Sequence, residues 1–295
     1  MNSSSPATVF WWRPAAWLRV TGGDAASFLQ GQFTNDLRGR SSGSAVYGLW
    51  LNVKGKIVAD SFVLRGVNAD EFWVGSYYSP AAVIRERLES FVIADDVVIA
   101  DETAAWSAVA IGGEGDAATW AVTPAVGFCF CGRRGRGAAQ EWVFPTPAAN
   151  DVRTRLAGLR ELSADDVAFR RIEAGVPAVP VDLGPGDLPN EGGLETEAIS
   201  YTKGCYLGQE VIARLKSMGQ VRRKLVGVAI AAGKIPPLPA PLFLGARQVG
   251  NLRSVAPDGA GAWIGLAMVT LLHGASGAQL AFGAELPVEV SVVNL

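Results

Sequence analysis

The sequence predicts an α+β fold in which mixed helices and strands are followed by a small all-β unit. Helical and strand-like segments are interspersed as far as about residue 215. From Leu225 onward, apolar or alternating segments are separated by Gly and Pro turns, which is typical of short strands. The 295 residues suffice for two or three compact units, and the change of pattern puts a boundary between Leu215 and Arg222.

Five helices are predicted in the first part, each from a start signal. Asp24 is a candidate N-cap before an apolar face, with Gly31 as the stop, and Ser79-Pro80 opens a second amphipathic helix. Ser163 and Asp166 resemble a capping box. Two more helices are predicted, one beginning at Thr146-Pro147 and one just after Gly208. In chain order, the last three of the five helices are predicted at residues 146–159, 163–175 and 209–215.

Strands are predicted where apolar or alternating runs are bounded by turn residues. The Pro- and Gly-rich segment from Val176 to Glu191 is predicted to be a loop. In chain order the strands lie at residues 45–51, 57–64, 71–74, 97–100, 107–111, 126–130, 225–230, 247–255, 262–269 and 286–293.

Composition excludes several classes of protein. A net charge of −2 provides no positive electrostatic field that would recruit DNA or an anionic membrane. No continuous apolar segment reaches the ~18 residues that are needed to span a bilayer. Three cysteines are too few for a disulfide scaffold, which favours a reducing compartment, and the first 14 residues resemble neither a secretory signal nor a transit peptide. We therefore expect a cytoplasmic protein. With one histidine, and no second cysteine pair beside Cys129 and Cys131, no metal site is expected.

The most informative stretch is Lys203-Gly204-Cys205-Tyr206-Leu207-Gly208-Gln209-Glu210, called the octapeptide below. A cysteine just before a predicted helix, two residues after a lysine, is placed where positive charge favours a thiolate. The alternative is a small buried cysteine between turns. The glycines, charges and amides around Cys205 favour a functional thiol, with Lys203 as its charged neighbour.

The octapeptide resembles the signature of the YgfZ-type folate-binding proteins, a branch of the glycine-cleavage T-protein (aminomethyltransferase) superfamily. Three further segments resemble motifs of that superfamily, in the same order along the chain. They are Gly22–Ala25 with Phe28–Gln32 and Thr34–Asp36; Leu51–Asp60; and Arg171–Pro177 with Leu188–Glu191.

The resemblance implies three lobes around a central folate-binding opening. Two intertwined α+β lobes are then expected within residues 1–220, one from residues 1–45 with 145–220 and one from residues 46–144. Residues 221–295 would form a C-terminal β-barrel. The implied cofactor is tetrahydrofolate or a folate derivative.

Two acidic residues carry the predicted chemistry. In the superfamily, the glutamate of the Arg-x-Glu-x-Gly segment grips the pterin, which makes Glu173 the expected clasp; an exposed Glu173 paired with Arg170 or Arg171 is the alternative. The resemblance places Asp60 where a carboxylate assists the folate nitrogen, although Ala59 stands where aminomethyltransferases have a second aspartate. A pterin cavity held by Glu173 is expected beside Cys205.

The resemblance implies further folate contacts near the central opening. The basic run from Val211 to Lys224 contains no acid and suits an anionic glutamate tail, or equally a solvated surface; RNA contact is a third option that the net charge does not support. The expected contacts are Asn35, Asp36, Asn52, Lys54, Arg171, Gln209 and Arg223.

Three functions remain open on these grounds. The first is a tetrahydrofolate-binding accessory protein that supports iron–sulfur cluster synthesis or repair, with a link to tRNA modification and with iron–sulfur proteins or their assembly factors as partners. The second is a folate-dependent aminomethyltransferase, which Ala59 disfavours. The third is a folate-binding relic with a regulatory or scaffolding role. A monomer that binds neither DNA nor membranes is expected.

Overall fold

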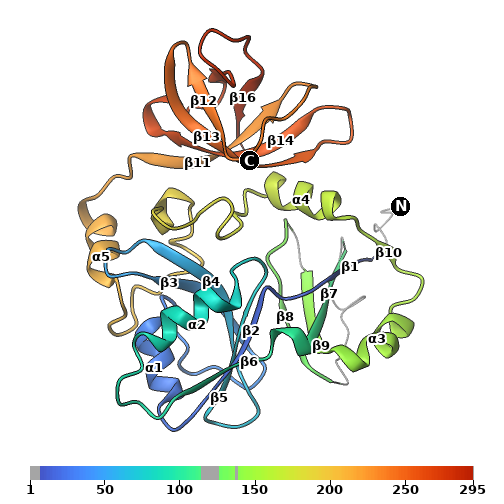
Figure 1. Ribbon diagram of the computed structural model, residues 1–295, viewed down its shortest axis with the longest axis vertical. Helices are drawn as coiled ribbons and strands as arrows, with labels where there is room; N and C mark the ends of the chain where they lie inside the picture. Colours follow the sequence, from blue (N-terminus) through green and yellow to red (C-terminus); the bar gives the residue numbers. More distant parts are fainter. Residues whose placement is uncertain (1–6, 114–125, 137–138, 295) are drawn as a thin grey trace.

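Three sheets, one in each lobe, organise the chain in a computed structural model that describes residues 7–113, 126–136 and 139–294 (Figure 1). The first two lobes lie side by side, and the third lies across them at the C-terminal end. The predicted α+β fold with three lobes is confirmed.

The first lobe has a five-stranded sheet of order β3-β4-β5-β2-β6, packed against two helices. Helices α1 and α2 place Leu29, Ile84 and Leu88 on this sheet, in a core where all three are fully buried. The elements are β2 (Ala16–Thr21), α1 (Ala25–Gln32), β3 (Ala45–Leu51), β4 (Ile57–Arg65), β5 (Glu71–Ser76), α2 (Ala81–Glu89) and β6 (Val98–Asp101).

The second lobe has a five-stranded sheet of order β10-β1-β7-β9-β8. Helix α3 packs Val152 on this sheet, and α4 begins with the predicted capping box, in which Ser163 and Asp166 exchange hydrogen bonds. The elements are β1 (Thr8–Trp12), η1 (Thr103–Ala105), β7 (Trp106–Gly112), β8 (Phe128–Cys131), β9 (Ala139–Pro145), η3 (Thr146–Ala148), α3 (Ala149–Arg155), β10 (Arg160–Glu161) and α4 (Ala164–Glu173).

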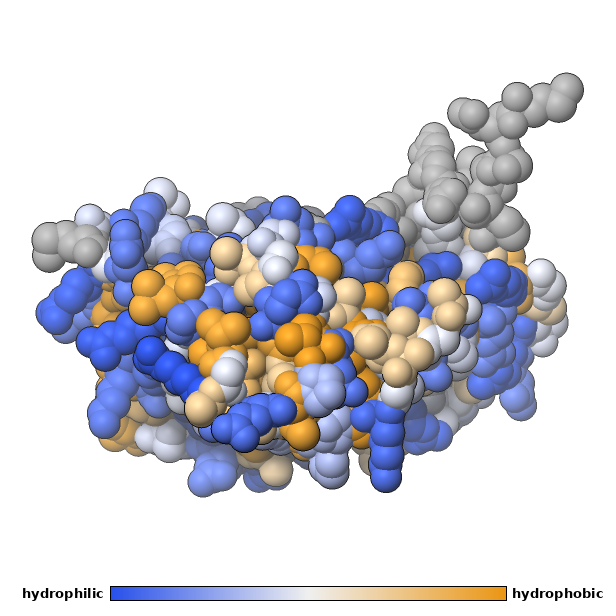
Figure 2. Space-filling view, turned by 90° about the horizontal axis from the view of Figure 1, so that it is seen from above, coloured by the Kyte–Doolittle hydropathy of each residue, from blue (hydrophilic) through white to orange (hydrophobic). Residues whose placement is uncertain are grey.

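The third lobe is a barrel-like sheet of order β12-β13-β14-β11-β16-β15. A bridge between Phe243 and Ala281, with hydrogen bonds in both directions, joins its two ends. Figure 2 looks down on this lobe, where apolar surface lies among charged side chains. The remaining elements are η4 (Pro189–Glu191), α5 (Gln209–Met218), β11 (Arg223–Ile230), β12 (Ala240–Leu244), β13 (Arg247–Pro257), β14 (Trp263–Thr270), η5 (Leu271–His273), β15 (Gln279–Leu280) and β16 (Val290–Val293).

Strand pairing divides the N-terminal region differently from the predicted division into residues 1–45 with 145–220 and residues 46–144. Strand β2 pairs with β5 and β6, so residues 16–101 share one sheet. Strand β1 pairs with β7 and β10 and belongs to the second sheet. The short link between β1 and β2 therefore crosses from one lobe to the other.

Two apolar clusters hold the lobes together. Trp17, Trp73 and Trp106 pack with Phe130 and Val143 between the first two sheets. A second cluster joins β3 and β4, the segment after α4 and the barrel, through residues that include Leu49, Ile172, Ile212 and Met268. Apolar burial on this scale makes the relative placement of the lobes part of the folded core.

Candidate functional site

The octapeptide forms an exposed turn that leads into α5. Cys205 is exposed and precedes the helix by four residues, so its sulfur lies outside the first helical turn. The side chain of Gln209 accepts a hydrogen bond from the backbone N–H of Tyr206 at 3.2 Å and so shapes this turn. Gln209 thus has a local structural contact, and its predicted contact with folate stays a prediction.

Lys203 is buried, and its ammonium group is fully engaged. Its Nζ donates to the backbone oxygens of Gln30 at 2.7 Å, Phe33 at 2.6 Å and Asn35 at 2.9 Å. An ammonium has three donors, and all three are taken by these carbonyl groups. Burial lowers the pKa of Lys203 to about 8. Lys203 therefore holds the segment after α1, and its expected role as the charged neighbour of Cys205 stays a prediction.

Asn35 connects this segment to the centre of the protein. Its side-chain amide donates to the backbone oxygens of Tyr47 at 2.9 Å and Glu197 at 3.0 Å. Asp36 instead pairs with Arg38 at 2.8 Å, and that hydrogen-bonded guanidinium holds the pKa of Asp36 well below its usual range. Of the two neighbours, Asn35 is the one that points inward.

Asn52 and Lys54 lie in the turn between β3 and β4. The side-chain oxygen of Asn52 accepts hydrogen bonds from the backbone N–H groups of Lys54 and Lys56, and the Lys54 side chain is exposed. This turn packs against the octapeptide, because a Cβ atom on Gly208 would stand 2.7 Å from the Asn52 carbonyl oxygen. Two of the predicted motifs are therefore in direct contact.

Asp60 lies at the base of a small pocket between the first two lobes. Its Oδ1 accepts hydrogen bonds from Ser76 at 2.8 Å and Ser79 at 2.7 Å, and its Oδ2 accepts one from the Tyr47 hydroxyl at 3.1 Å. Burial raises the pKa of Asp60, and these hydrogen bonds oppose that shift. The pocket, called the Asp60 pocket below, is lined by Asp60, Tyr77, Tyr78, Arg133, Arg134, Val167, Arg171, Val176 and Pro177.

Arg133 closes this pocket on one side. Its guanidinium carbon lies 3.9 Å from the centre of the Tyr47 ring, and its Nη1 donates to the Tyr47 hydroxyl at 3.1 Å. Its Nη2 forms an ion pair with Glu197, whose side chain is 46% exposed. With Arg133 in place, the cavity volume is about 10 Å³, which is room for about one water molecule.

A second arginine stands beside Arg133 on the same segment. Arg134 is buried and forms an ion pair of 2.8 Å with the fully buried Glu141, whose carboxylate also accepts the Tyr77 hydroxyl. Sequence reasoning missed Arg133, Arg134 and Glu197. The only feature of the sequence that could have indicated these residues is the pair of adjacent arginines just after a strand. Their distance along the sequence from Glu197 gives no sign that Arg133 and Glu197 are in contact.

Arg171 lines the Asp60 pocket, so the structure brings these two predicted residues together. Its charge is nevertheless committed to a buried ion pair of 2.5 Å with Asp182, and its Nη2 donates to Ser254 of the barrel. Arg223 forms ion pairs of 3.0 Å with Asp187 and Glu191. Both arginines thus fasten the loop after α4 to the barrel.

Glu173 lies at the end of α4 with an exposed side chain, and it is not among the residues that line the Asp60 pocket. It directly precedes Ala174 and Gly175, which line a wider groove of about 490 Å³ beneath the barrel, together with Lys224. The predicted grip of Glu173 on a pterin stays a prediction.

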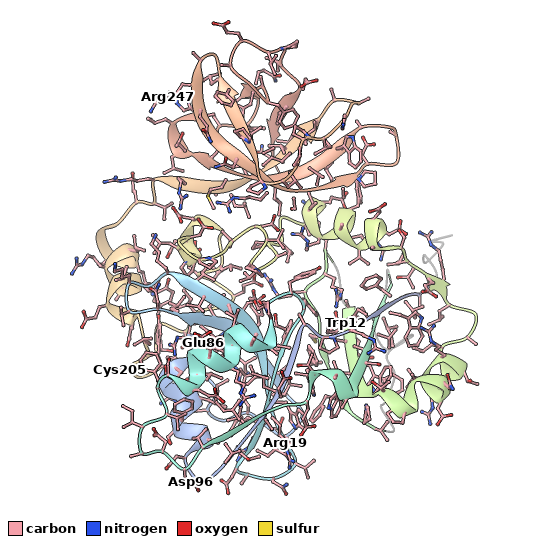
Figure 3. All side chains as sticks on the ribbon, in the orientation of Figure 1. Trp12, Arg19, Glu86, Asp96, Cys205 and Arg247 are labelled. Carbon is pink, nitrogen blue, oxygen red and sulfur yellow. The ribbon has the colours of Figure 1, made fainter. Side chains whose placement is uncertain are left out.

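Cys205 lies apart from the Asp60 pocket. It is not one of the lining residues, and Figure 3 shows it at the outer edge of the molecule, well away from α4. The expected cavity held by Glu173 beside Cys205 stays a prediction, because neither residue lines the Asp60 pocket. The connection is indirect and runs from Lys203 through Asn35 to Tyr47 and Glu197.

The remaining cysteines offer no second centre in the described part of the chain. Cys131 is exposed, Cys129 is partly buried, and the three cysteines form no disulfide. Within residues 7–113, 126–136 and 139–294, no three His, Cys, Asp or Glu side chains are grouped as a metal ion would require. Over the same residues, no helix has the length and apolar character needed to cross a membrane.

Residues 8–118 match the family model of the GCVT N-terminal domain. The iron–sulfur cluster assembly factor IBA57 of Homo sapiens, a mitochondrial protein, is 29% identical over 315 residues, which covers 92% of this chain and 82% of that protein. Its Mus musculus counterpart is 29% identical over 256 residues, which covers 76% of this chain and 66% of that protein.

The tRNA-modifying protein YgfZ of Edwardsiella ictaluri is 29% identical over 245 residues. The alignment covers 76% of this chain and 71% of that protein. Among solved structures, the glycine cleavage system aminomethyltransferase T from Bartonella henselae shares the fold, with a TM-score of 0.78 at 18% identity over 99% of this chain and 86% of that one. This chain therefore contains a region that matches the GCVT N-terminal domain, is similar in sequence to IBA57 and YgfZ over most of its length, and shares the fold of aminomethyltransferase T.

Proposed function

We propose that this protein binds a tetrahydrofolate and supports the assembly or repair of iron–sulfur clusters in other proteins, including enzymes that modify tRNA. The observation that carries the folate part is the buried Asp60 carboxyl, which faces a pocket at the junction of the lobes. The named relatives are an iron–sulfur cluster assembly factor and a tRNA-modifying protein, and they support the second part.

The residues of the Asp60 pocket suit a pterin in their chemistry. Asp60 offers a carboxyl group to ring N–H donors, and Tyr77 offers an aromatic face and a hydroxyl group. Tyr47, which contacts Asp60 and Arg133, offers a second aromatic face behind the Arg133 side chain. The cavity is large enough for a pterin only if a side chain moves, because a volume of about 10 Å³ does not accommodate a bicyclic ring. A bound tetrahydrofolate would supply nitrogens that carry one-carbon units.

The chain's own residues fix the carboxyl of Asp60 in this pocket. Three hydroxyl groups donate to it and set its orientation, and burial raises its pKa above the ordinary value of an aspartate. Ala59, next to it on β4, is buried in the apolar core of the first lobe. The single carboxylate disfavours aminomethyl transfer as the activity.

Cys205 is proposed as the thiol that meets a cluster, a sulfur species or a partner protein. Its exposure makes it accessible to a large partner, and its separation from the Asp60 pocket means that a small ligand there leaves it uncovered. The proposal includes a monomer that acts in the cytoplasm.

Complementation of a bacterial strain that lacks its YgfZ-type protein tests this function. The wild-type chain is expected to restore the activity of enzymes that contain iron–sulfur clusters, and Cys205→Ser is expected to lose that ability. Cys131→Ser is the matched control, because it removes an equally exposed thiol from another lobe. Full rescue by Cys205→Ser would remove the thiol from the mechanism, and robust folate-dependent aminomethyl transfer in vitro would favour the transferase instead.

A further inference from the structure

The guanidinium of Arg133 occupies the part of the Asp60 pocket that is best suited to a flat ligand. It stacks on the Tyr47 ring at 3.9 Å, donates to the Tyr47 hydroxyl and to the Pro177 carbonyl oxygen, and pairs with Glu197. Its side chain is only 10% exposed, although it belongs to a segment outside any helix or strand. A side chain alone, rather than an element of the fold, thus fills this space.

A guanidinium and the amino-pyrimidine edge of a pterin have the same recognition chemistry. Both are planar N–C–N units that present adjacent N–H donors, which a carboxylate accepts in a bidentate arrangement. Both stack on an aromatic face. The partners that hold Arg133, an aromatic ring and a carboxylate, are therefore the partners that a pterin requires.

We propose that Arg133 is a built-in substitute for the pterin, that the ligand displaces it from Tyr47, and that Glu197 then becomes the carboxylate that clasps the ring. This inference rests on the proposed folate binding and assigns the clasp to a residue that the sequence motifs did not indicate. It also explains why the pocket is small with Arg133 in place.

Glu197 is suited to exchange one partner for another. Its backbone oxygen accepts the Asn35 amide at 3.0 Å, which fixes the main chain, while its side chain is 46% exposed and stays hydrated when its partner leaves. The exchange therefore leaves no buried unpaired charge at Glu197. Because Asn35 is itself held by Lys203, the octapeptide positions the clasp from a distance.

The Tyr47 hydroxyl keeps a hydrogen-bond acceptor when Arg133 is displaced. It donates to Asp60 at 3.1 Å, and this bond is separate from the one that the hydroxyl accepts from Arg133. Burial and the nearby Asp60 carboxyl raise the pKa of Tyr47 well above its ordinary value, so the hydroxyl retains its proton. The displaced guanidinium loses the Tyr47 and Pro177 contacts and gains water.

Binding of 5-formyltetrahydrofolate and of tail-less 6-methyltetrahydropterin, measured by calorimetry on the full chain, tests this inference. Arg133→Ala is expected to bind both ligands about tenfold more tightly than the wild type, because the competing side chain is gone. Adding Glu197→Gln to Arg133→Ala is expected to weaken both by about tenfold or more, because a charge-assisted hydrogen bond is lost. Arg133→Gln is the second variant if Arg133→Ala is not recovered folded. Glu195→Gln is the control that should change nothing, because Glu195 is on the same loop but lines a different pocket, whereas Glu197 pairs with Arg133.

The outcomes separate this inference from the proposed function. Weaker binding by Arg133→Ala would make Arg133 a ligand contact and overturn the substitution. Equal affinities of the single and double variants would overturn the clasp while leaving folate binding intact. If neither the wild type nor Arg133→Ala binds either ligand, folate binding fails together with the inference.

Discussion

The Lys203 ammonium donates a hydrogen bond of 2.9 Å to the carbonyl oxygen of Asn35, which joins the octapeptide to the segment that follows α1. The Asn35 amide in turn bonds the main chain at Tyr47 and Glu197. Two motifs more than 160 residues apart are thus parts of one hydrogen-bonded unit. The lysine of the octapeptide consequently has a structural role.

Lys203→Met is expected to lower the free energy of unfolding by about 2–4 kcal/mol, because three buried carbonyl groups lose a charged donor. Chemical denaturation measures this change. Lys54→Met is the matched control, since Lys54 is exposed in a turn, and it should cost no more than about 0.5 kcal/mol. Equal effects of the two substitutions would contradict the role assigned to Lys203.

The three cysteines are expected to react with an alkylating reagent at different rates. Cys205 and Cys131 are exposed and should be modified first at pH 7, whereas burial raises the pKa of Cys129 to about 12 and should leave it largely unmodified. Peptide mass spectrometry over a time course measures each rate.

Lys203→Met provides a further comparison in the same experiment. Because the ammonium is directed to carbonyl groups, the substitution should leave the rate at Cys205 within about twofold, provided the variant is folded. A large fall in that rate would place the ammonium in the environment of the sulfur and contradict the structure.

Local signals predicted the elements that depend on local chemistry. The capping box of Ser163 and the strand Ala45–Leu51 occur as predicted, because each is determined by adjacent residues. Asp24 is at the N-cap of α1, but its carboxylate accepts the Asp96 N–H instead of capping the helix. Strands β1, β2, β9, β10, β12 and β15 were missed. Two of them, β1 and β2, carry tryptophans that pack between lobes, and the sequence around a residue does not reveal such a role.

The site was predictable only where a motif carried it. Asp60 and Arg171, both in motifs, line the same pocket, but the pair of Arg133 and Glu197 joins residues 64 apart in the sequence. No periodicity or spacing encodes such a contact, because it follows from how the sheets are placed. A place in a motif does not by itself put a residue at the site. Cys205 and Glu173 both belong to motifs, yet neither lines the Asp60 pocket.

Asp60→Asn is expected to change stability in a pH-dependent way. The pKa of Asp60 is higher in the folded protein than in the unfolded chain, so the folded state binds more protons in the window between the two values. The stability that this group contributes is present below the unfolded pKa of about 3.9 and is lost as pH rises through the folded value. The melting temperature of Asp60→Asn relative to the wild type should therefore be higher at pH 7 than at pH 4.

Differential scanning fluorimetry between pH 4 and pH 7 checks this expectation. A difference in melting temperature that is the same at every pH would reflect the altered hydrogen bond to Tyr47 and does not bear on the pKa of Asp60. A difference that grows as pH falls would show the opposite sign and mean that the hydroxyl groups and Arg133 outweigh burial.

Two glycines of the octapeptide allow a matched test of its packing. Gly208 has a φ of 85°, and a Cβ there would stand 2.7 Å from the Asn52 carbonyl oxygen, whereas a Cβ on Gly204 would meet nothing within 4 Å. Gly208→Ala should lower the free energy of unfolding by about 2–4 kcal/mol, since the left-handed backbone alone costs about 1–2 kcal/mol and the clash adds to it. Gly204→Ala should stay within about 0.5 kcal/mol.

The same pair of substitutions separates two reasons why a cysteine is flanked by glycines. If the glycines serve packing, Gly204→Ala retains both stability and complementation, and Gly208→Ala loses complementation only to the extent that it unfolds. If Gly204→Ala instead abolishes complementation in a fully stable protein, the open space beside Cys205 is itself required, as it would be for a partner that approaches the thiol closely. Denaturation curves and complementation of the deficient strain, measured on both variants, distinguish the two cases.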